Sequence, residues 1–503
     1  MSHAYCVFPR LDLEEYLTKE DYRKSRKELI AEGVGGFCVF GKVSLDHARR
    51  AINELRSETD RDLIFSADFE NGLPMRLIEG TEFPHAMALG KTGDHQKTFI
   101  ASQIIGKESH QIGVNWIFGP VVDINSNKKN PIINIRSFGE DPETVGVHAA
   151  AYIKGLEESG IMSCAKHFPG HGDTDTDSHI SLPILNFDKK RLEEFEFKPF
   201  VKSIKNGVQS IMIGHLAVPS IDSSNMPASL SEKVIDVLKN ELNFDGIIIS
   251  DALDMNSIKD TYSSADAAEK AVRAGNHIAL MPEDPREAIQ RFKELSESDN
   301  EFAELLKSNE DIIKEKFEWV FDNKIKIETG DLKKLFMEHE KISLTIARSA
   351  VELEIKESLT PIEYGKQVAS FTFLQHGVDL PKATMFYNLL QQAIENDIDF
   401  AYIDENISQH DLMGMKEGTV DADIFIFAYF YRSKAWNSDL GDLDKIEAIK
   451  EYLAHGKKII NIFFGNPYLS EGMKGQMNIK TFSSSLSSLA SAVMVLSGKE
   501  LIE

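Results

Sequence analysis

The segment that decides the fold is IMSCAKHFPGHGDTDTDSH (161–179), in which a short apolar run leads directly into a loop of titratable side chains. Residues 161–165 form a continuous apolar run, typical of a strand that is buried on both faces of a parallel sheet. The next part contains histidines, aspartates and a lysine, and Pro169, Gly170 and Gly172 exclude a regular helix there. The segment therefore predicts a strand followed by a polar loop that could carry chemistry.

Similar apolar runs recur along the first 300 residues. They include AYCVF near residue 4, GGFCVF near 35, LIFSA near 63, VNWIF near 114, VQSIMIG near 208, GIIIS near 246 and HIALM near 277. Amphipathic segments such as SLDHARRAINELRSE and SEKVIDVLKNEL separate several of them, and this alternation indicates parallel strands linked by helices. Roughly eight such units in about 250–330 residues match a (β/α)8 barrel. The predicted fold class is α/β, with a TIM-like barrel over residues 1–335.

A barrel of this kind predicts that chemically active residues come directly after strands, because the carboxyl ends of the strands meet on one face. Asp68 follows LIFSA, Lys166 and His167 follow IMSCA, His215 follows IMIG, and Asp251 follows IIIS. One polar residue in such a position is often only a helix cap. Polar residues after four strands favour a shared site instead.

The pattern changes after about residue 300. A charged helical stretch, EKFEWVFDNKIKIETGDLKKLFMEHEKISLTIARSA, leads to new apolar runs, QVASFTFLQ near 367, ADIFIFAYF near 422 and KKIINIFFG near 458. Helical segments flank two of these runs, so the sequence predicts a smaller α/β sandwich domain over residues 345–503. We find no catalytic motif in this part.

Composition limits the possible partners and location. The chain has 503 residues, which is too long for one ordinary core, and its net charge of −24 argues against binding to nucleic acid or to an anionic membrane. No apolar run could span a bilayer, and the first residues lack a signal-peptide pattern, so we expect a cytoplasmic monomer or homodimer. The three cysteines, Cys6, Cys38 and Cys164, lie in apolar runs and predict buried thiols rather than disulfides.

The polar loop admits two metal-based interpretations. A calcium loop starting at Asp173 fails, because Ser178 stands where glycine is needed and Ile184 where glutamate is needed. A metal-dependent hydrolase remains a distant alternative, although HExxH is absent. Its ligands in the loop would be His171, Asp173, Asp177 and His179.

An acid/base device explains the loop more simply. Asp177 and His179 are two residues apart, so the carboxylate can orient the imidazole and leave its other nitrogen free to exchange a proton. An imidazole with an ordinary pKa of about 6.5 both donates and accepts protons near neutrality.

KHFPGHGDTDTDSH resembles the corresponding loop of bacterial β-N-acetylglucosaminidases in glycoside hydrolase family 3. DFENGLPMR (68–76) is similar to the family's DQEGGRVxR, NIRSFGEDPE (134–143) to its RSFGEDP segment, and IIISDALDM (247–255) to the end of its nucleophile strand. ARSAVELEI and NIFFGNPYL resemble parts of its C-terminal domain. The resemblance covers nearly the whole chain.

The resemblance implies a role for each matching residue. Asp251 corresponds to the nucleophile, His179 to the general acid/base, and Asp177 to the partner of that histidine. The predicted substrate-binding residues are Asp68, Arg76, Arg136, Lys166 and His167, and we add His215 because it follows a strand. No metal or cofactor is implied. The sequence departs from the family pattern at Phe69, Asn71 and Leu73. These departures leave the choice of sugar open.

The expected function is that of a retaining exo-β-N-acetylglucosaminidase. Its substrate would be a carbohydrate with a terminal β-linked GlcNAc, released from cell-wall (muropeptide) or chitin-derived oligosaccharides. The main alternative is a phosphorylase on the same scaffold, because a neutral histidine does not repel phosphate as a carboxylate would, and the family includes phosphorolytic members.

Overall fold

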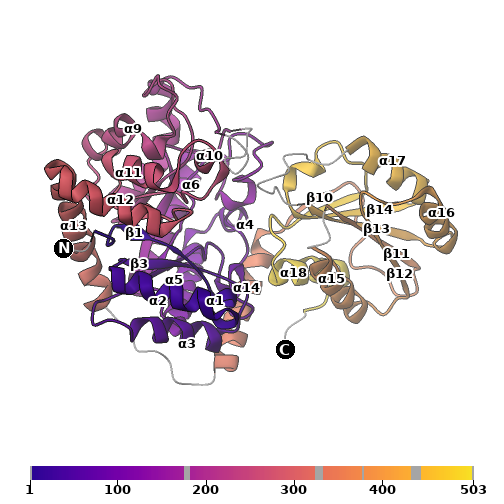
Figure 1. Ribbon diagram of the computed structural model, residues 1–503. Helices are drawn as coiled ribbons and strands as arrows, with labels where there is room; N and C mark the ends of the chain where they lie inside the picture. Colours follow the sequence, from indigo (N-terminus) through magenta and orange to yellow (C-terminus); the bar gives the residue numbers. More distant parts are fainter. Residues whose placement is uncertain (1–2, 175–181, 323–331, 376–378, 432–442, 501–503) are drawn as a thin grey trace.

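The computed structural model describes residues 3–174, 182–322, 332–375, 379–431 and 443–500. Figure 1 shows a larger first unit, drawn in indigo to red, beside a smaller second unit, drawn in orange to yellow. Each unit is built on a sheet of mainly parallel strands covered by helices. The predicted α/β class is confirmed.

The first unit contains a curled sheet of seven parallel strands that neighbour one another in chain order. These strands are β2 (Arg10–Asp12), β3 (Gly36–Phe40), β4 (Ile64–Ala67), β5 (Trp116–Ile117), β6 (Met162–Phe168), β7 (Ser210–Ile213) and β8 (Ile247–Ser250). A further parallel pair joins β1 (Val7–Phe8) to β9 (Ala279–Leu280). Backbone hydrogen bonds from Ser250 N to Ile278 O and from Leu253 N to Leu280 O connect β8 to the segment around β9.

Each of the eight apolar runs predicted in this unit contains a strand. The short strand β2 was not predicted, because its residues Arg-Leu-Asp do not form an apolar run. The strands are buried as expected of a sheet that is covered on both sides: every residue of β4, β6, β7 and β8 is buried.

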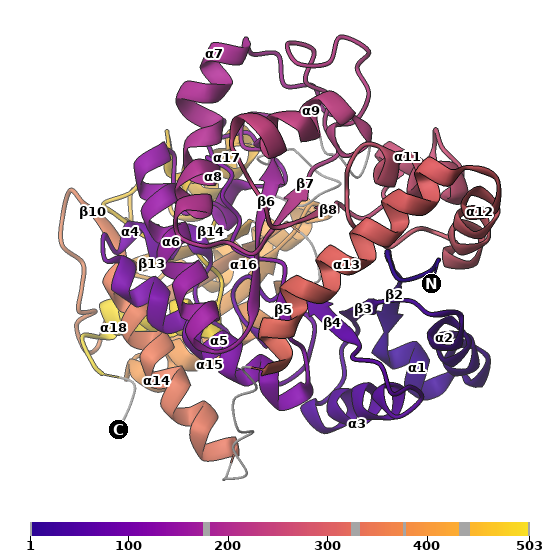
Figure 2. The same cartoon turned by 90° about the vertical axis from the view of Figure 1, so that its left-hand side faces the viewer.

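Helices surround the curled sheet, and one of them crosses in front of its strands (Figure 2). They are α1 (Leu13–Thr18), α2 (Glu20–Glu32), α3 (Leu45–Arg56), α4 (Ala86–Lys91), α5 (His95–Ile112), α6 (Pro142–Glu158), α7 (Lys189–Arg191), α8 (Phe197–Lys205), α9 (Glu232–Asp236), α10 (Asn256–Lys259), α11 (Ser264–Arg273), α12 (Pro285–Ser298) and α13 (Asn300–Asp322). The helix predicted over SEKVIDVLKNEL begins as α9 and continues as a π-helical turn over Val237–Glu241.

Trp116 on β5 belongs to the core of the first unit. Its side chain is fully buried, and its indole Nε1 donates a hydrogen bond to Ser210 Oγ on β7 at 2.9 Å. Edge-to-face contacts surround the ring, from Phe8, Phe118 and Phe317, with centroids 6.0, 4.9 and 5.4 Å away. Phe317 belongs to α13, which crosses in front of the strands in Figure 2. This packing joins residues of β1, β5 and α13 within the core of the first unit.

The second unit contains a six-stranded sheet in the order β10-β15-β14-β13-β11-β12, in which only the β10–β15 pair is antiparallel. The strands are β10 (Glu352–Ile355), β11 (Val368–Leu374), β12 (Ile398–Ile403), β13 (Ile424–Tyr431), β14 (Lys458–Gly465) and β15 (Met477–Lys480). Helices α15 (Leu380–Ala393) and α18 (Leu486–Ser497) pack on one face, and α16 (Gln409–Gly418) and α17 (Leu443–Leu453) on the other (Figure 1).

The three apolar runs predicted in this part became β11, β13 and β14. The strands β10, β12 and β15 were not predicted; β10 and β12 lie at the two edges of the sheet and leave several residues exposed. Helix α14 (Leu332–Ala350) runs through the predicted boundary between residues 335 and 345, so the division into two domains there stays a prediction.

Two further expectations concern the chain as a whole. Cys6, Cys38 and Cys164 are free and buried, as predicted. Within the described residues, no helix combines the length and apolarity that crossing a membrane requires.

Candidate active site

A cavity of about 650 Å³ lies at the carboxyl ends of the strands of the first unit. Six of the predicted site residues line it: Asp68, Arg76, Arg136, Lys166, His167 and Asp251. Asp68 and Asp251 directly follow β4 and β8, and Lys166 and His167 lie near the carboxyl end of β6. Asp68, Lys166, His167 and Asp251 were predicted to lie close together because each follows a predicted strand, and the structure places all four around one cavity.

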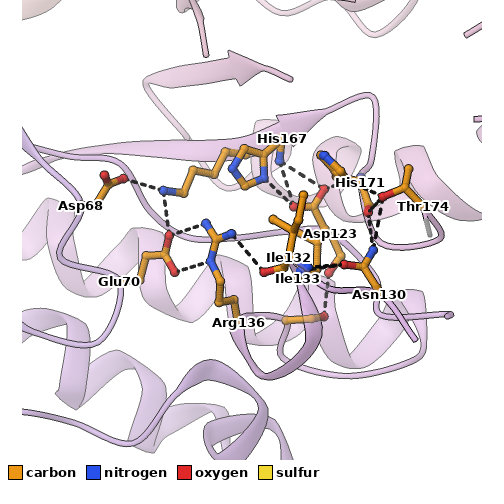
Figure 3. Close-up of polar contacts among 12 residues, drawn as sticks. Asp68, Glu70, Asp123, Asn130, Ile132, Ile133, Arg136, His167, His171 and Thr174 are labelled. Carbon is orange, nitrogen blue, oxygen red and sulfur yellow. Dashed lines mark hydrogen bonds and ion pairs between the residues drawn. The ribbon is translucent and has the colours of Figure 1, made fainter. Parts of the chain in front are cut away.

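A network of buried charges forms one part of the cavity wall (Figure 3). Lys166 Nζ lies 2.8 Å from Asp68 Oδ1 and 2.8 Å from Glu70 Oε1. The Arg136 guanidinium binds both oxygens of Glu70 at 2.7 and 3.0 Å, and Arg76 Nη2 lies 2.6 Å from Asp68 Oδ2. Two carboxylates thus share three cations, and the Lys166 side chain is only 3% exposed.

The charges in this network stabilise one another against burial. Burial by itself would raise the pKa of Asp68, but Lys166 and Arg76 hold it well below its usual range. Burial likewise opposes ionisation of Glu70, and Arg136 and Lys166 keep its pKa well below normal. Burial would lower the pKa of Lys166, and the two carboxylates raise it instead. All these groups are therefore charged near neutral pH and can form strong hydrogen bonds to hydroxyl groups.

Asp123 organises the histidines beside this network. Its side chain is buried, and its Oδ2 lies 2.7 Å from His167 Nδ1. The backbone N–H groups of His167 and His171 also donate to this carboxylate, at 3.2 and 2.7 Å. The contact with Asp123 places a proton on Nδ1 of His167, so Nε2 is the nitrogen left for the cavity. Burial lowers the pKa of His171 to about 4, which keeps that imidazole neutral.

Asn130 ties together the two loops that follow β5 and β6. Its Oδ1 accepts hydrogen bonds from the backbone N–H groups of Ile132 and Ile133, at 2.9 and 2.8 Å, and its Nδ2 donates to the carbonyl of His171 at 2.8 Å (Figure 3). The carbonyl of Ile132 in turn accepts from Arg136. The position of Arg136 therefore depends on Asn130, a side chain that does not line the cavity.

Asp251 opens the loop after β8, and its backbone N–H donates to Ile213 O at 2.9 Å. Asp254, three residues later, lines the same cavity. Burial raises the pKa of Asp254, and although Arg10 opposes this effect, the charge of Asp251 adds to it. The loop thus presents two carboxyl groups to the cavity.

His215 does not line the cavity, contrary to the role in substrate binding predicted for it. Its side chain is fully buried, with Nδ1 2.7 Å from Ser229 Oγ and Nε2 2.8 Å from Ala252 O. A residue two places after a strand end can turn behind the wall as readily as into the site. Here His215 fixes the peptide that follows Asp251.

The three departures from the family pattern also point away from the cavity. Phe69 and Leu73 are fully buried, and Asn71 Nδ2 donates to the carbonyl of Phe83 at 2.9 Å. None of the three lines the cavity that contains Asp68. They change the packing behind the wall, so the expectation that they alter the sugar pocket is not supported by their positions.

Five residues at the site were not predicted as site residues, and a sixth, His171, was considered only as a metal ligand; the five are Arg10, Glu70, Asp123, Asn130 and Asp254. Glu70 lies two residues after Asp68, so the motif itself contained a signal for it. Asp123 and Asn130 belong to an irregular segment after a two-residue strand and carry no comparable signal. Asp177 and His179 lie outside the described residues.

The hypothesis of a metal-dependent hydrolase requires metal ligands in the loop after β6. In the part of the chain that the structure describes, no three His, Cys, Asp or Glu side chains group as metal ligands. Two of the four loop ligands suggested by the sequence, Asp177 and His179, lie outside that part, so the hypothesis stays untested.

Comparison with known proteins identifies the family to which the chain belongs. The model of the glycosyl hydrolase family 3 N-terminal domain matches residues 11–314, which is more than half of the chain. The chain belongs to glycoside hydrolase family 3. The match spans the curled sheet and every described residue of the charge network.

Among relatives in this family, β-hexosaminidase A of Pseudoalteromonas piscicida is 36% identical over 282 residues, which cover 51% of this chain and 47% of that protein. The β-hexosaminidase of Chromobacterium violaceum is 31% identical over 265 residues, covering 51% of this chain and 73% of that protein. The matched region spans about half the length of the first such relatives.

Solved structures extend the similarity to both units. A family 3 β-N-acetylglucosaminidase from Paenibacillus sp. str. FPU-7 superposes with a TM-score of 0.85 at 25% identity, covering 99% of this chain and 96% of that one. A β-glucoside phosphorylase, BglX, superposes with a TM-score of 0.83 at 19% identity, covering 98% and 91%. At that identity the second likeness concerns the fold alone.

We predict that Lys166→Met destabilises the protein by about 3–5 kcal/mol at pH 7, because it leaves Asp68 and Glu70 buried without their shared cation. In the wild type these carboxyls have depressed pKa values in the folded state, so their stabilisation is present at neutral pH and is lost as the pH falls. In the variant, burial favours protonation, so acid relieves the destabilisation.

The stability difference between the two proteins should therefore shrink between pH 7 and about pH 4, the ordinary range of carboxyl pKa values. Urea denaturation at several pH values measures it. Lys154→Met, which removes an exposed ion pair with Glu157, is the control and should cost under about 0.5 kcal/mol. A difference for Lys166→Met that is small at pH 7, or that grows in acid, would contradict this account.

Proposed function

We propose that this protein is a retaining exo-β-N-acetylglucosaminidase, with its site on a (β/α)8 barrel that is followed by an α/β sandwich domain. It would release terminal β-linked GlcNAc from cell-wall (muropeptide) or chitin-derived oligosaccharides. The observation that carries the proposal is the position of Asp251: its carboxylate shares one cavity with the network of Asp68, Lys166 and Arg136. A nucleophile next to a wall of charged hydrogen-bonding groups is what a glycosidase requires.

The proposed reaction has two steps. In the first, Asp251 attacks the anomeric carbon as the glycosidic bond breaks, forming a glycosyl ester, while a general acid protonates the leaving oxygen. In the second, the same group takes a proton from water, which attacks the ester and releases the sugar with its configuration retained. We assign the acid/base role to His179 and its orientation to Asp177 from their match to the family loop.

Groups of the described cavity would hold the sugar. Asp68 and Lys166 offer an acceptor and a donor to neighbouring hydroxyls, and His167 offers Nε2 because Asp123 occupies its Nδ1. These contacts come from rigid strand ends, which reduces the entropy lost when the sugar is aligned with the nucleophile. His215 supports Asp251 from behind through its contact with Ala252 O.

The names of the relatives support the same activity. The relatives from Pseudoalteromonas piscicida and Chromobacterium violaceum are both called β-hexosaminidases, and the Paenibacillus structure is described as a β-N-acetylglucosaminidase. Those descriptions belong to those proteins, and they agree with the chemistry proposed for this chain.

Phosphorolysis is the alternative that uses the same first step, with phosphate in place of water. A phosphate dianion needs cations that can turn towards it. Arg76, Arg136 and Lys166 each already bind carboxylates of the cavity wall. Among the described residues, Arg10 is the remaining guanidinium that lines the cavity, so a phosphate would have to bind there, and we propose water, which needs only a base, as the acceptor.

Product analysis tests the proposal. With an aryl β-GlcNAc glycoside, we expect free GlcNAc at the same rate in the presence and absence of about 10 mM phosphate, and a much slower reaction with the matching glucoside and xyloside. Chromatography and mass spectrometry identify the sugar product. Formation of GlcNAc 1-phosphate, with turnover that depends on phosphate, would establish the phosphorylase instead. No cleavage of any β-glycoside would refute both.

The role of His179 is tested by the leaving group. General acid/base catalysis contributes about 10²–10⁴-fold, so His179→Ala should lose a factor of that order on a disaccharide. A dinitrophenolate leaves without a proton, so the first step on a dinitrophenyl glycoside should change far less. The second step still needs a base, and azide, which needs none, should restore turnover as glycosyl azide.

Asp177→Asn, which weakens the orientation of the imidazole but keeps the imidazole itself, should give a milder form of the same pattern. An equal loss for every leaving group, with no effect of azide, would remove His179 from the catalytic role.

A further inference from the structure

Tyr468 connects the second unit to the first from a buried position. It lies on a 3₁₀ turn, Pro467–Ser470, directly after β14, and is 8% exposed. Its hydroxyl donates to Glu140 Oε1 at 2.6 Å and accepts from Asn125 Nδ2 at 2.8 Å. Both partners belong to the first unit, so one hydroxyl group bridges the two units at this point.

The two partners of Tyr468 lie near the two ends of one loop, residues 123–140. Within this loop the Asn125 backbone N–H donates to Gly139 O at 3.0 Å, and Ser137 Oγ donates to Asp123 O at 2.6 Å. These bonds close the base of the loop from inside. The hydroxyl of Tyr468 closes it from outside by joining Asn125 to Glu140.

The same loop carries side chains that shape the cavity. Asp123 orients His167, Asn130 fixes the backbone at Ile132, and Arg136 binds Glu70 in the charge network. A shift at the base of the loop would therefore move several sugar-binding groups together.

Asn125 depends on Tyr468 in particular. Its side chain is fully buried, and within the described residues its Oδ1 has no hydrogen-bond partner. The contact with Tyr468 is thus the side-chain hydrogen bond that holds the Asn125 amide. Buried polar groups that lose such a partner make the surrounding structure rearrange.

We propose that Tyr468 is a positioning residue for the active site, through which the second unit sets the geometry of loop 123–140. The effect of Tyr468 on catalysis rests on the proposed function. The effect of Tyr468 on the geometry of loop 123–140 is independent of that function. The second unit would then contribute to sugar binding without touching the sugar.

The interface offers a matched control. Ser483, also buried in the second unit, pairs with His85 of the first unit, with Oγ 2.8 Å from Nδ1 and 3.2 Å from the backbone N. Ser483→Ala removes a buried polar contact across the same interface, but at a segment outside loop 123–140. Tyr468→Phe keeps the aromatic ring packed against Met87, Ile135 and Phe482 and removes only the hydroxyl.

The test compares full-length wild type, Tyr468→Phe and Ser483→Ala. We expect Tyr468→Phe to lower kcat/KM for an aryl β-GlcNAc glycoside by about tenfold, mostly through a higher KM, because misplaced binding groups weaken sugar binding. Hydrogen–deuterium exchange of the backbone amides in residues 123–140 should become faster. Ser483→Ala should lower the thermal midpoint while leaving KM and the exchange of this loop unchanged.

Glu140→Gln provides a second approach to the same contact. It keeps the shape of the acceptor and weakens the bond, so its effect should be smaller, and the double variant should be no worse than Tyr468→Phe alone. A Tyr468→Phe protein with a lower thermal midpoint but unchanged kcat/KM, or with unchanged exchange in loop 123–140, would show a purely structural contact and overturn the proposal. If the wild type cleaves no glycoside, the proposed function fails, and the exchange measurement alone decides the role of Tyr468.

Discussion

The ammonium group of Lys166 between Asp68 and Glu70 is the interaction on which the site depends. Taking a lysine almost completely out of water is unfavourable, and two carboxylates within hydrogen-bonding distance offset that cost. The three residues come from the ends of β4 and β6 and thus join strands that are distant in sequence. Through Glu70 the network extends to Arg136, so one buried cation couples two strand ends and a long loop.

This coupling explains how an irregular loop can serve as a precise binding wall. Residues 123–140 contain only one short helical turn, Asn134–Arg136, and cannot rely on regular backbone hydrogen bonds. They are held instead by buried side chains, with Asp123 and Asn130 inside the loop and Tyr468 outside it. The second unit is therefore part of this arrangement, because the Tyr468 hydroxyl adds contacts to Asn125 and Glu140 at the base of the loop.

The sequence was sufficient to predict the residues whose position follows from a local rule. Asp68, Lys166, His167 and Asp251 stand at the ends of apolar runs, and parallel strands bring such ends together. The rule fails for His215, which lies two residues after the end of β7 and contacts Ala252 O instead of lining the cavity. The prediction also missed β2, which contains no apolar run, and the edge strand β12, although β12 contains the short run FAYI (400–403).

What the sequence could not give are contacts between distant segments. The pairing of Glu70 with Arg136, and that of Asn125 with Tyr468, join residues 66 and 343 positions apart. Composition and periodicity contain no information on such pairs. The sequence also does not show which way a side chain points. Phe69 and Leu73 were expected to affect the sugar pocket, but their side chains are buried and do not line the cavity.

The central claim is that Asp251 attacks the sugar held by this cavity, and trapping the intermediate tests it most directly. A 5-fluoro glycoside of GlcNAc slows both the formation and the hydrolysis of the glycosyl ester, but a good leaving group such as fluoride keeps the formation fast, so the enzyme should accumulate the ester. Mass spectrometry of the digested protein should then find the label on the peptide that contains IIISDALDM, and fragmentation should assign it to Asp251. An Asp251→Ala protein should fold normally and take up no label. A label on Asp254 or on any other residue would contradict the account.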